Sequence, residues 1–255
     1  RGLFFANTLW PRALIGQAAR CPILGKSSLT MKRRQMYDIR GGTAIHKLYL
    51  SPQKRFSEDI DLVQIRPEGI GPTLFKLRET LAFLGEPKTK RKANNNLLVY
   101  SFEATEPPFS SHKLKIEINC REHFSTLGYT NIPFAVNSPW FSGECRITTY
   151  EFEELIGTKV RALYQRRKGR DLFDLYLALK NRPLDLIKTI ECYREYISFA
   201  GAAAPSGKQF LSNLEEKMQD RFFRSDVSNI IGPEIKYDPD EAFAVVCNAL
   251  LPIMT

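Results

Sequence analysis

The spacing of apolar residues changes at about Ile147, and this change limits the folds open to the chain. Before it, short segments with alternating apolar residues are interspersed with a few helical ones, which is typical of a mixed sheet. After it, five successive segments have helical spacing: 148–166, 170–180, 184–199, 208–223 and 239–250. We therefore expect an α/β (α+β) fold, with a mixed-sheet domain at 37–147 followed by a helical domain at 148–255.

Within the first half, the pattern predicts short strands and two helices. We expect strands at 37–40, 57–65, 97–104 and 113–119, and helices at 43–50 and 72–84. The strands at 97–104 and 113–119 are close enough in sequence to be neighbours in the sheet. The segment 85–96 is polar and basic, so we interpret it as a connector.

The formal net charge of +9 is concentrated at the amino terminus. No acidic residue precedes Asp38, whereas seven basic residues do: Arg1, Arg12, Arg20, Lys26, Lys32, Arg33 and Arg34. We interpret 1–36 as an atypical basic segment, and we expect residues 1–30 to be dispensable for the main fold because they lack periodic apolar patterning. The remainder of the chain is nearly neutral, so net charge alone predicts no nucleic-acid-binding surface on it.

Two further features indicate the cellular compartment. No run of about 18 apolar residues occurs, which argues against a membrane span. The five cysteines are widely spaced and form no CxxC pair: Cys21, Cys120, Cys145, Cys192 and Cys247. This spacing favours separate free thiols over a disulfide framework or a zinc site, and we expect a cytoplasmic protein.

A pair of carboxylates on the strand at 57–65 indicates a metal site. Asp59 and Asp61 alternate along the strand, so they point to one face about 6–7 Å apart. Two carboxylates at this spacing repel each other unless a cation neutralises them, and Mg²⁺ or Mn²⁺ prefers such oxygen ligands. A solvated strand face is the alternative interpretation of the same pattern.

A Gly-Gly turn precedes that strand. Gly41 and Gly42 allow the backbone to approach a ligand closely, and a helix beginning there presents free N–H groups to an anion. Thr43 can add a hydroxyl contact or cap the helix. Together with the two aspartates, the turn predicts a triphosphate held between backbone amides and a metal, although an isolated Gly-Gly is usually an ordinary turn.

Two other residues can join this site. Glu117 alternates with apolar residues on the strand at 113–119. It would supply a third carboxylate to the site if that strand lies beside the strand of Asp59 and Asp61. Three carboxylates around two metal ions suit in-line nucleotidyl displacement. Ser57 shares the face of the aspartates, where it would contact a phosphate, accept a modification, or simply end the strand.

Two blocks of residues resemble the nucleotidyltransferases related to the AbiEii abortive-infection toxins, within the DNA polymerase β-like superfamily. The first block is Gly41-Gly42-Thr43-Ala44 followed by Arg55-x-Ser57-x-Asp59-Ile60-Asp61-Leu62. The second is Thr158-Lys159-x-x-Ala162-Leu163-x-x-Arg166-x-Lys168-x-Arg170-Asp171-x-x-Asp174-Leu175-Tyr176. The match covers roughly 37–179. Members of the family normally have a helical segment before the Gly-Gly-Thr strand, and 1–36 shows no convincing amphipathic helix.

The second block adds three candidate residues. Lys159 lies in an apolar helical stripe, where a lysine usually has an anionic partner or extends to solvent. The resemblance implies that its partner is a nucleotide phosphate. Asp171 and Asp174 share a helix face, and the resemblance implies catalytic or nucleotide-orienting roles. Asp171 near a helix start is also favourable as an N-terminal charge.

The resemblance implies a metal-dependent enzyme that moves a nucleoside monophosphate from an NTP to an acceptor. Asp59, Asp61 and Glu117 would hold the metal and activate the acceptor hydroxyl. The resemblance also implies the toxin of a toxin–antitoxin pair, with an antitoxin partner and tRNA as a plausible RNA acceptor. A catalytically degenerate nucleotide- or RNA-binding module and a phosphotransferase remain the alternatives.

Two basic clusters are candidates for RNA contact. The first follows the helix at 72–84, and the second lies at the junction of the two expected helices in the second block. Their members are Lys88, Lys90, Arg91 and Lys92 in the first, and Arg161, Arg166, Arg167 and Lys168 in the second. We favour the second because it lies nearer the expected site, and we expect the first to be a solvated loop.

Overall fold

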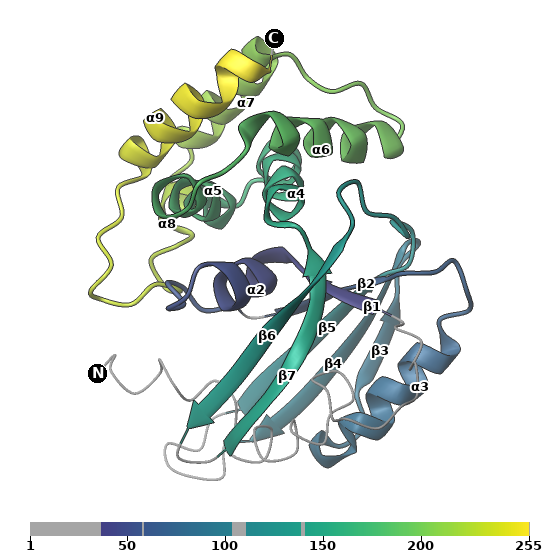
Figure 1. The fold of residues 1–255 in the computed structure, drawn as a ribbon. Coiled ribbons are helices and arrows are strands. Elements are labelled where there is room, and N and C mark those ends of the chain that lie inside the picture. The colour runs from purple at the N-terminus through teal and green to yellow at the C-terminus, as the bar shows by residue number, and fades with distance from the viewer. Residues whose placement is uncertain (1–36, 58, 104–110, 139–140, 255) are drawn as a thin grey trace. The chain divides into compact units, whose positions relative to one another are not determined.

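The computed structural model describes residues 37–57, 59–103, 111–138 and 141–254, drawn in colour in Figure 1. Our expectations for 1–36 lie outside the described residues. The chain divides into two compact units. The first, which we call the sheet unit, comprises the described residues up to Thr43 together with Ser57–Phe124 and Tyr129–Thr149. The second, the helical unit, comprises Ala44–Phe56, Ser125–Gly128 and the described residues from Tyr150 onward.

A seven-stranded mixed sheet forms the centre of the sheet unit, in the order β3-β4-β5-β2-β1-β7-β6 (Figure 1). The strands are β1 (Tyr37–Arg40), β2 (Asp59–Gln64), β3 (Lys88–Arg91), β4 (Asn95–Glu103), β5 (Ser111–Asn119), β6 (Tyr129–Ser138) and β7 (Phe141–Tyr150). β2 runs parallel to β5 and antiparallel to β1, while β4 is antiparallel to both β3 and β5. The expected mixed sheet is therefore confirmed. The strands expected at 97–104 and 113–119 correspond to β4 and β5, and they pair as expected.

One face of this sheet is apolar because its residues alternate with the polar ones. Leu62, Leu98 and Ile116 are each no more than 1% exposed on that face. Helix α3 (Gly71–Thr80) and the short helix η2 (Ala82–Leu84) follow β2, and α3 contributes the fully buried Leu77. The opposite face carries Asp59 and the residues in register with it, and we call it the carboxylate face.

Three strands were not expected from the sequence. β3 lies in the segment that we interpreted as a connector, and all four of its residues are exposed. β3 and β6 are the two edges of the sheet, so neither needs the alternation that marks a half-buried strand. Pro133 within β6 is consistent with an edge position, since proline has no backbone N–H to donate to a neighbouring strand.

The helix after β1 changes type along its length. α2 (Gly41–Ala44) continues directly into the π-helix η1 (Ile45–Tyr49), which buries Ile45 and His46. The expected helix at 43–50 is thus confirmed with an earlier start. The division between the two units falls after Thr43. π-helical turns are rare and often mark functional sites.

All five helices expected after Ile147 are present. They are α4 (Phe152–Gln165), α5 (Gly169–Asn181), α6 (Leu186–Phe199), α7 (Gly207–Met218) and α9 (Pro239–Leu250), with the short α8 (Arg221–Ser225) and η3 (Leu251–Ile253) in addition. α7 stops before 223 because Asp220 accepts a hydrogen bond from the Phe222 N–H and starts a new helix there. Ser206 and Gln209 form a capping box at the start of α7.

Two expected absences can be compared with the described residues. Among the helices described, none is long and apolar enough to cross a membrane. Cys120, Cys145, Cys192 and Cys247 are free, and Cys21 lies outside the described residues.

Candidate active site

The register of β2 and β5 brings three predicted site residues onto the carboxylate face. Asp59 lies opposite Lys115, and Asp61 lies opposite Glu117, across this parallel pair. Residues in register on paired strands point to the same face of the sheet. The expected adjacency of the strand that carries Glu117 and the strand that carries the two aspartates is therefore confirmed. On the other side of β2, Arg40 of β1 lies opposite Asp61.

Each of these carboxylates has a polar neighbour. Lys115 Nζ lies 3.1 Å from both side-chain oxygens of Asp59, at the partly exposed surface. Asp59 Oδ1 is buried and accepts no hydrogen bond among the described residues. Asn95 donates a hydrogen bond of 2.5 Å to Glu117 Oε1. The lysine thus supplies the positive charge that Asp59 requires on this face.

The Gly-Gly turn lies directly against Asp61. Gly41 has a φ of +73°, and a Cβ atom added there would be 2.2 Å from Asp61 Oδ2. Only glycine accommodates both the left-handed backbone and this approach. The predicted turn and the predicted carboxylates are therefore brought together in the sheet unit.

Thr43 fastens the other end of the turn to the start of β2. Its Oγ1 lies 2.6 Å from Ser57 Oγ and donates a hydrogen bond of 2.7 Å to the Asp59 carbonyl. Thr43 is buried, and it does not cap the short helix through its side chain in any contact described. In this structure, Thr43 and Ser57 position the strand that carries the aspartates.

The donor set on the carboxylate face is compatible with a divalent cation. Within the described residues, no three side chains of His, Cys, Asp or Glu are close enough to form a ready metal cluster. Asp59 and Asp61 nevertheless offer hard oxygen ligands on one face, with Glu117 in register beside them. Lys115 holds the position of a counter-charge beside Asp59, and its flexible side chain can withdraw when a cation binds.

The helical unit contains a second group of charges, which is buried except for the half-exposed side chain of Arg166. Lys159 Nζ lies 2.9 Å from Asp171 Oδ1 and 2.9 Å from Asp174 Oδ2. Arg166 binds Asp171 through two hydrogen bonds of 2.6 and 2.8 Å. Arg55 binds Asp174 in the same bidentate manner, at 2.6 and 2.8 Å. We call these five residues, together with His46, the buried charge network.

The cations of this network keep both carboxylates ionised. Burial disfavours the charged form of Asp174, but Arg55 and Lys159 outweigh it and hold the pKa of that carboxyl well below its ordinary value. Lys159 and Arg166 likewise lower the pKa of Asp171 against the effect of burial. Despite its own burial, the pKa of Lys159 is raised by the two aspartates. The expectation that Lys159 has an anionic partner is met here by carboxylates, and extension to solvent is excluded.

His46 is the neutral member of the network. Its Nε2 lies 2.8 Å from Asp174 Oδ1, and its ring stacks on Phe173 with centroids 6.3 Å apart. Burial lowers the pKa of the imidazole below its ordinary value, so His46 is uncharged at neutral pH. Nδ1 is buried without a hydrogen-bond partner among the described residues.

Sequence reasoning missed the roles of His46 and Arg55. Arg55 stands in the first block without a role of its own, and His46 lies between the two parts of that block at a position that the resemblance does not single out. The contacts of these two residues with Asp174 span 128 and 119 positions of the chain. The spacing of Arg55 from the aspartates was the only local signal, and it did not identify a partner.

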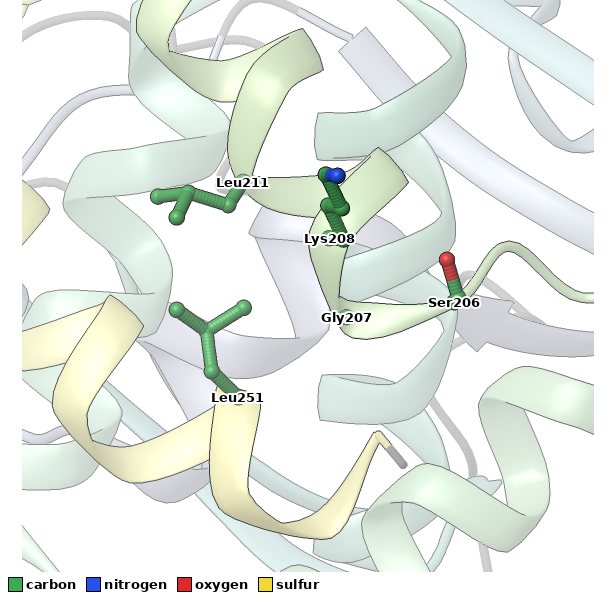
Figure 2. Close-up of a pocket in the computed structure, with 5 residues that line it drawn as sticks. All are labelled: Ser206, Gly207, Lys208, Leu211 and Leu251. Carbon is green, nitrogen blue, oxygen red and sulfur yellow. The ribbon is translucent and has the colours of Figure 1, made fainter.

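A pocket elsewhere in the helical unit contains none of the predicted site residues. It is lined by Ser206, Gly207, Lys208, Leu211 and Leu251. Figure 2 shows Leu211 and Leu251 pointing toward one another across it. Its lining is mainly apolar, and Lys208 is the one charged residue among those that line it.

Comparison with known families agrees with the two sequence blocks. The profile described as "Nucleotidyl transferase AbiEii toxin, Type IV TA system" matches residues 39–248. The chain belongs to the AbiEii family. It is thus a nucleotidyltransferase toxin of the type IV toxin–antitoxin class, and membership implies a nucleotide substrate and an antitoxin partner.

A solved structure shows a similar fold. The AbiEii chain is similar to the nucleotidyltransferase toxin MenT4 from Mycobacterium tuberculosis H37Rv, with 14% identity and a TM-score of 0.52. That similarity covers 98% of this chain and 96% of MenT4. An antigenic nucleotidyltransferase-like protein from Paracoccidioides brasiliensis has 18% identity and a TM-score of 0.35, over 76% of this chain and 82% of that one. No curated protein sequence matches.

Proposed function

We propose that this AbiEii protein transfers a nucleoside monophosphate from an NTP to a hydroxyl of an RNA acceptor, with tRNA a plausible acceptor. The observation that carries this proposal is the register that sets Glu117 opposite Asp61, two residues along the same face from Asp59 and beside the Gly41 turn. Carboxylates grouped at a glycine turn suit a substrate whose phosphates require both backbone amides and a metal. We place the reaction in the cytoplasm, where NTPs and RNA are available.

In this proposal, Asp59, Asp61 and Glu117 hold Mg²⁺ or Mn²⁺. The bound metal would neutralise charge on the phosphates during displacement. Gly41, Gly42 and Ser57 would contact the triphosphate, with Thr43 fixing the turn through its bond to the Asp59 carbonyl. Glu117 would accept the proton of the acceptor hydroxyl. A bond then forms between that oxygen and the α-phosphorus, while the bond to pyrophosphate breaks.

The residues of the second block retain a proposed role toward the nucleotide. An ammonium group has three N–H donors, and Lys159 has two carboxylate neighbours at 2.9 Å. In this proposal, the third donor would meet a phosphate oxygen of the nucleotide. Asp171 and Asp174 would orient Lys159 for that contact, since both are fully buried and tied to it.

Isotope position tests the reaction type directly. Total RNA is incubated with Mg²⁺, the protein and an NTP labelled at the α- or the γ-phosphate. We expect α-label in RNA and γ-label only in pyrophosphate, and we expect no incorporation by Asp61→Asn. Glu103→Gln is the matched control, because it makes the same chemical change at an exposed residue of β4. Transfer of γ-label would establish a phosphotransferase, and no transfer with intact NTP binding would establish a degenerate module.

A further inference from the structure

The edge strand β3 exposes basic side chains that have no acidic partner among the described residues. Lys88, Lys90 and Arg91 are exposed, and none forms an ion pair within the part of the chain that the structure describes. The other basic cluster differs, since Arg166 binds Asp171 and Arg167 pairs with Glu216. Two of the four members of the cluster that sequence reasoning favoured for RNA are therefore engaged with carboxylates. In the cluster interpreted as a solvated loop, Lys88, Lys90 and Arg91 lie on a strand and form no ion pair among the described residues.

The strand register places Lys88 and Lys90 on the carboxylate face. Lys88 lies opposite Val99, which lies opposite Lys115, and Lys115 lies opposite Asp59. This cross-strand row joins the sheet edge to the first of the two aspartates. Because each step between strands is about 4.8 Å, Lys88 lies about 14 Å from Asp59 along the row.

A parallel row starts from Lys90. Lys90 lies opposite Leu97, which lies opposite Glu117, and Glu117 lies opposite Asp61. Lys88 and Lys90 are two residues apart on β3, so they share a face. Both rows therefore run from an exposed lysine at the edge to a carboxylate of the candidate site.

Arg91 points to the other face of the same strand. It shares that face with Thr89, whose hydroxyl accepts a hydrogen bond of 2.8 Å from Arg78 of α3. Lys90 and Arg91 are thus adjacent, equally exposed and equal in charge, but only Lys90 lies on the carboxylate face. Comparing a substitution at Lys90 with the same substitution at Arg91 therefore separates the effect of position on the carboxylate face from the effect of net charge.

We propose that Lys88 and Lys90 bind the sugar-phosphate backbone of the RNA acceptor and direct its reactive end toward Asp59 and Asp61. This inference rests on the proposed function and names the surface that receives the acceptor. A row of about 14 Å exceeds what one triphosphate spans beside the metal ligands, so a longer polyanion fits it better than the NTP does. Lysine contacts to phosphate provide affinity without sequence specificity.

Edge protection is the competing explanation, because lysines on an edge strand discourage pairing with another chain. A glutamate protects an edge as well as a lysine does, but it repels RNA. Charge reversal therefore distinguishes the two explanations where neutralisation would not.

The test compares Lys90→Glu with Arg91→Glu in the full chain. Binding of a fluorescent RNA of about 12 nucleotides is measured by anisotropy across a salt series in EDTA, without NTP. We expect Lys90→Glu to weaken binding about 10-fold at low salt and to make the salt slope shallower by about 0.7, while Arg91→Glu behaves as wild type. Both variants should keep the melting shift that Mg²⁺ and NTP give wild type.

Equal RNA affinities of the two variants, or no RNA binding by wild type, would overturn the inference. Its failure is distinct from failure of the proposed function. If wild type transfers the α-label to RNA while Lys90→Glu and Arg91→Glu bind RNA alike, only the lysine rows are wrong. If RNA binding depends on Lys90 but no label is transferred, the surface stands and the proposed reaction does not.

Discussion

The Asp61 carboxylate occupies the space that a side chain at Gly41 would need, with Oδ2 only 2.2 Å from the position of an added Cβ. Gly41→Ala should therefore lower the free energy of unfolding through two separate effects. A left-handed φ costs a non-glycine residue about 1 kcal/mol. The Asp61 side chain must also move away from residue 41 to make room for the added Cβ. We expect a lower melting temperature, a smaller melting shift with Mg²⁺ and NTP, and a loss of nucleotide transfer.

Gly85→Ala isolates the first of these costs. Gly85 has a φ of +80°, but an added Cβ there meets nothing within 4 Å. The free energy of unfolding of Gly41→Ala should fall about 1 kcal/mol further than that of Gly85→Ala, and only Gly41→Ala should lose transfer. Equal losses of stability with equal activity would show that Asp61 is not held by the turn.

Asp59→Asn tests the metal site. The ion pair of Asp59 with Lys115 is partly exposed, so its loss should change the metal-free stability by no more than about 0.5 kcal/mol. Transfer should fall at least ~10²-fold, since a ligand for charge neutralisation is removed. Thermal melts with and without Mg²⁺ and NTP, run beside the transfer assay, give both quantities. An unchanged ligand-induced shift in the variant would remove Asp59 from the metal site.

Much of the sheet and of its carboxylate face could be predicted from the sequence, because a strand has a period of two residues. That period fixed Asp59 and Asp61 on one face and Glu117 on the polar side of its own strand. β3 could not be predicted, since a strand exposed on both faces shows no alternation. β6 was obscured by its edge position and by Pro133.

The buried charge network lay beyond sequence reasoning for a different reason. Lys159 and its neighbours on α4 and α5 are close in sequence, so their association was partly foreseen. Arg55 and His46 reach Asp174 across more than a hundred residues, and no local pattern encodes such a contact.

Lys159→Met should destabilise the protein strongly. The substitution leaves Asp171 and Asp174 buried with one cation fewer, and breaking a buried ion pair typically costs about 3–5 kcal/mol. Lys168→Met makes the same change at an exposed position and should alter stability by less than about 0.5 kcal/mol. Urea denaturation of both variants measures the difference. NTP affinity should be compared at a temperature where both remain folded.

Acid should expose the contribution of Asp174. Its pKa in the folded protein lies well below the ordinary 3.8, so it stabilises the fold above about pH 4 and ceases to do so as the pH falls through the folded value. Below pH 4, each such proton changes the unfolding free energy by about 1.4 kcal/mol per pH unit. Asp174→Asn should be less stable at pH 7 yet show a shallower decline between pH 4 and pH 2.

Denaturation in urea at several acidic pH values measures that slope. Asp185→Asn is the comparison at an exposed helix N-terminus: a hydrogen bond from the Lys188 N–H also lowers the pKa of Asp185, so Asp174→Asn should flatten the slope by more than Asp185→Asn does. Parallel slopes for wild type and Asp174→Asn would mean that this carboxyl titrates similarly in the folded and unfolded chains.

The interleaving of the two units has a consequence for how the enzyme comes into being. The sheet unit is not complete until Thr149 has been made, and the early segment Ala44–Phe56 belongs to a unit whose other parts follow much later. A growing chain that stops before Asp174 therefore contains Arg55 and His46 without the residue that anchors them. Protein synthesis thus delivers the signature residues early and the framework that organises them late, so a prematurely released fragment is not a smaller version of the toxin.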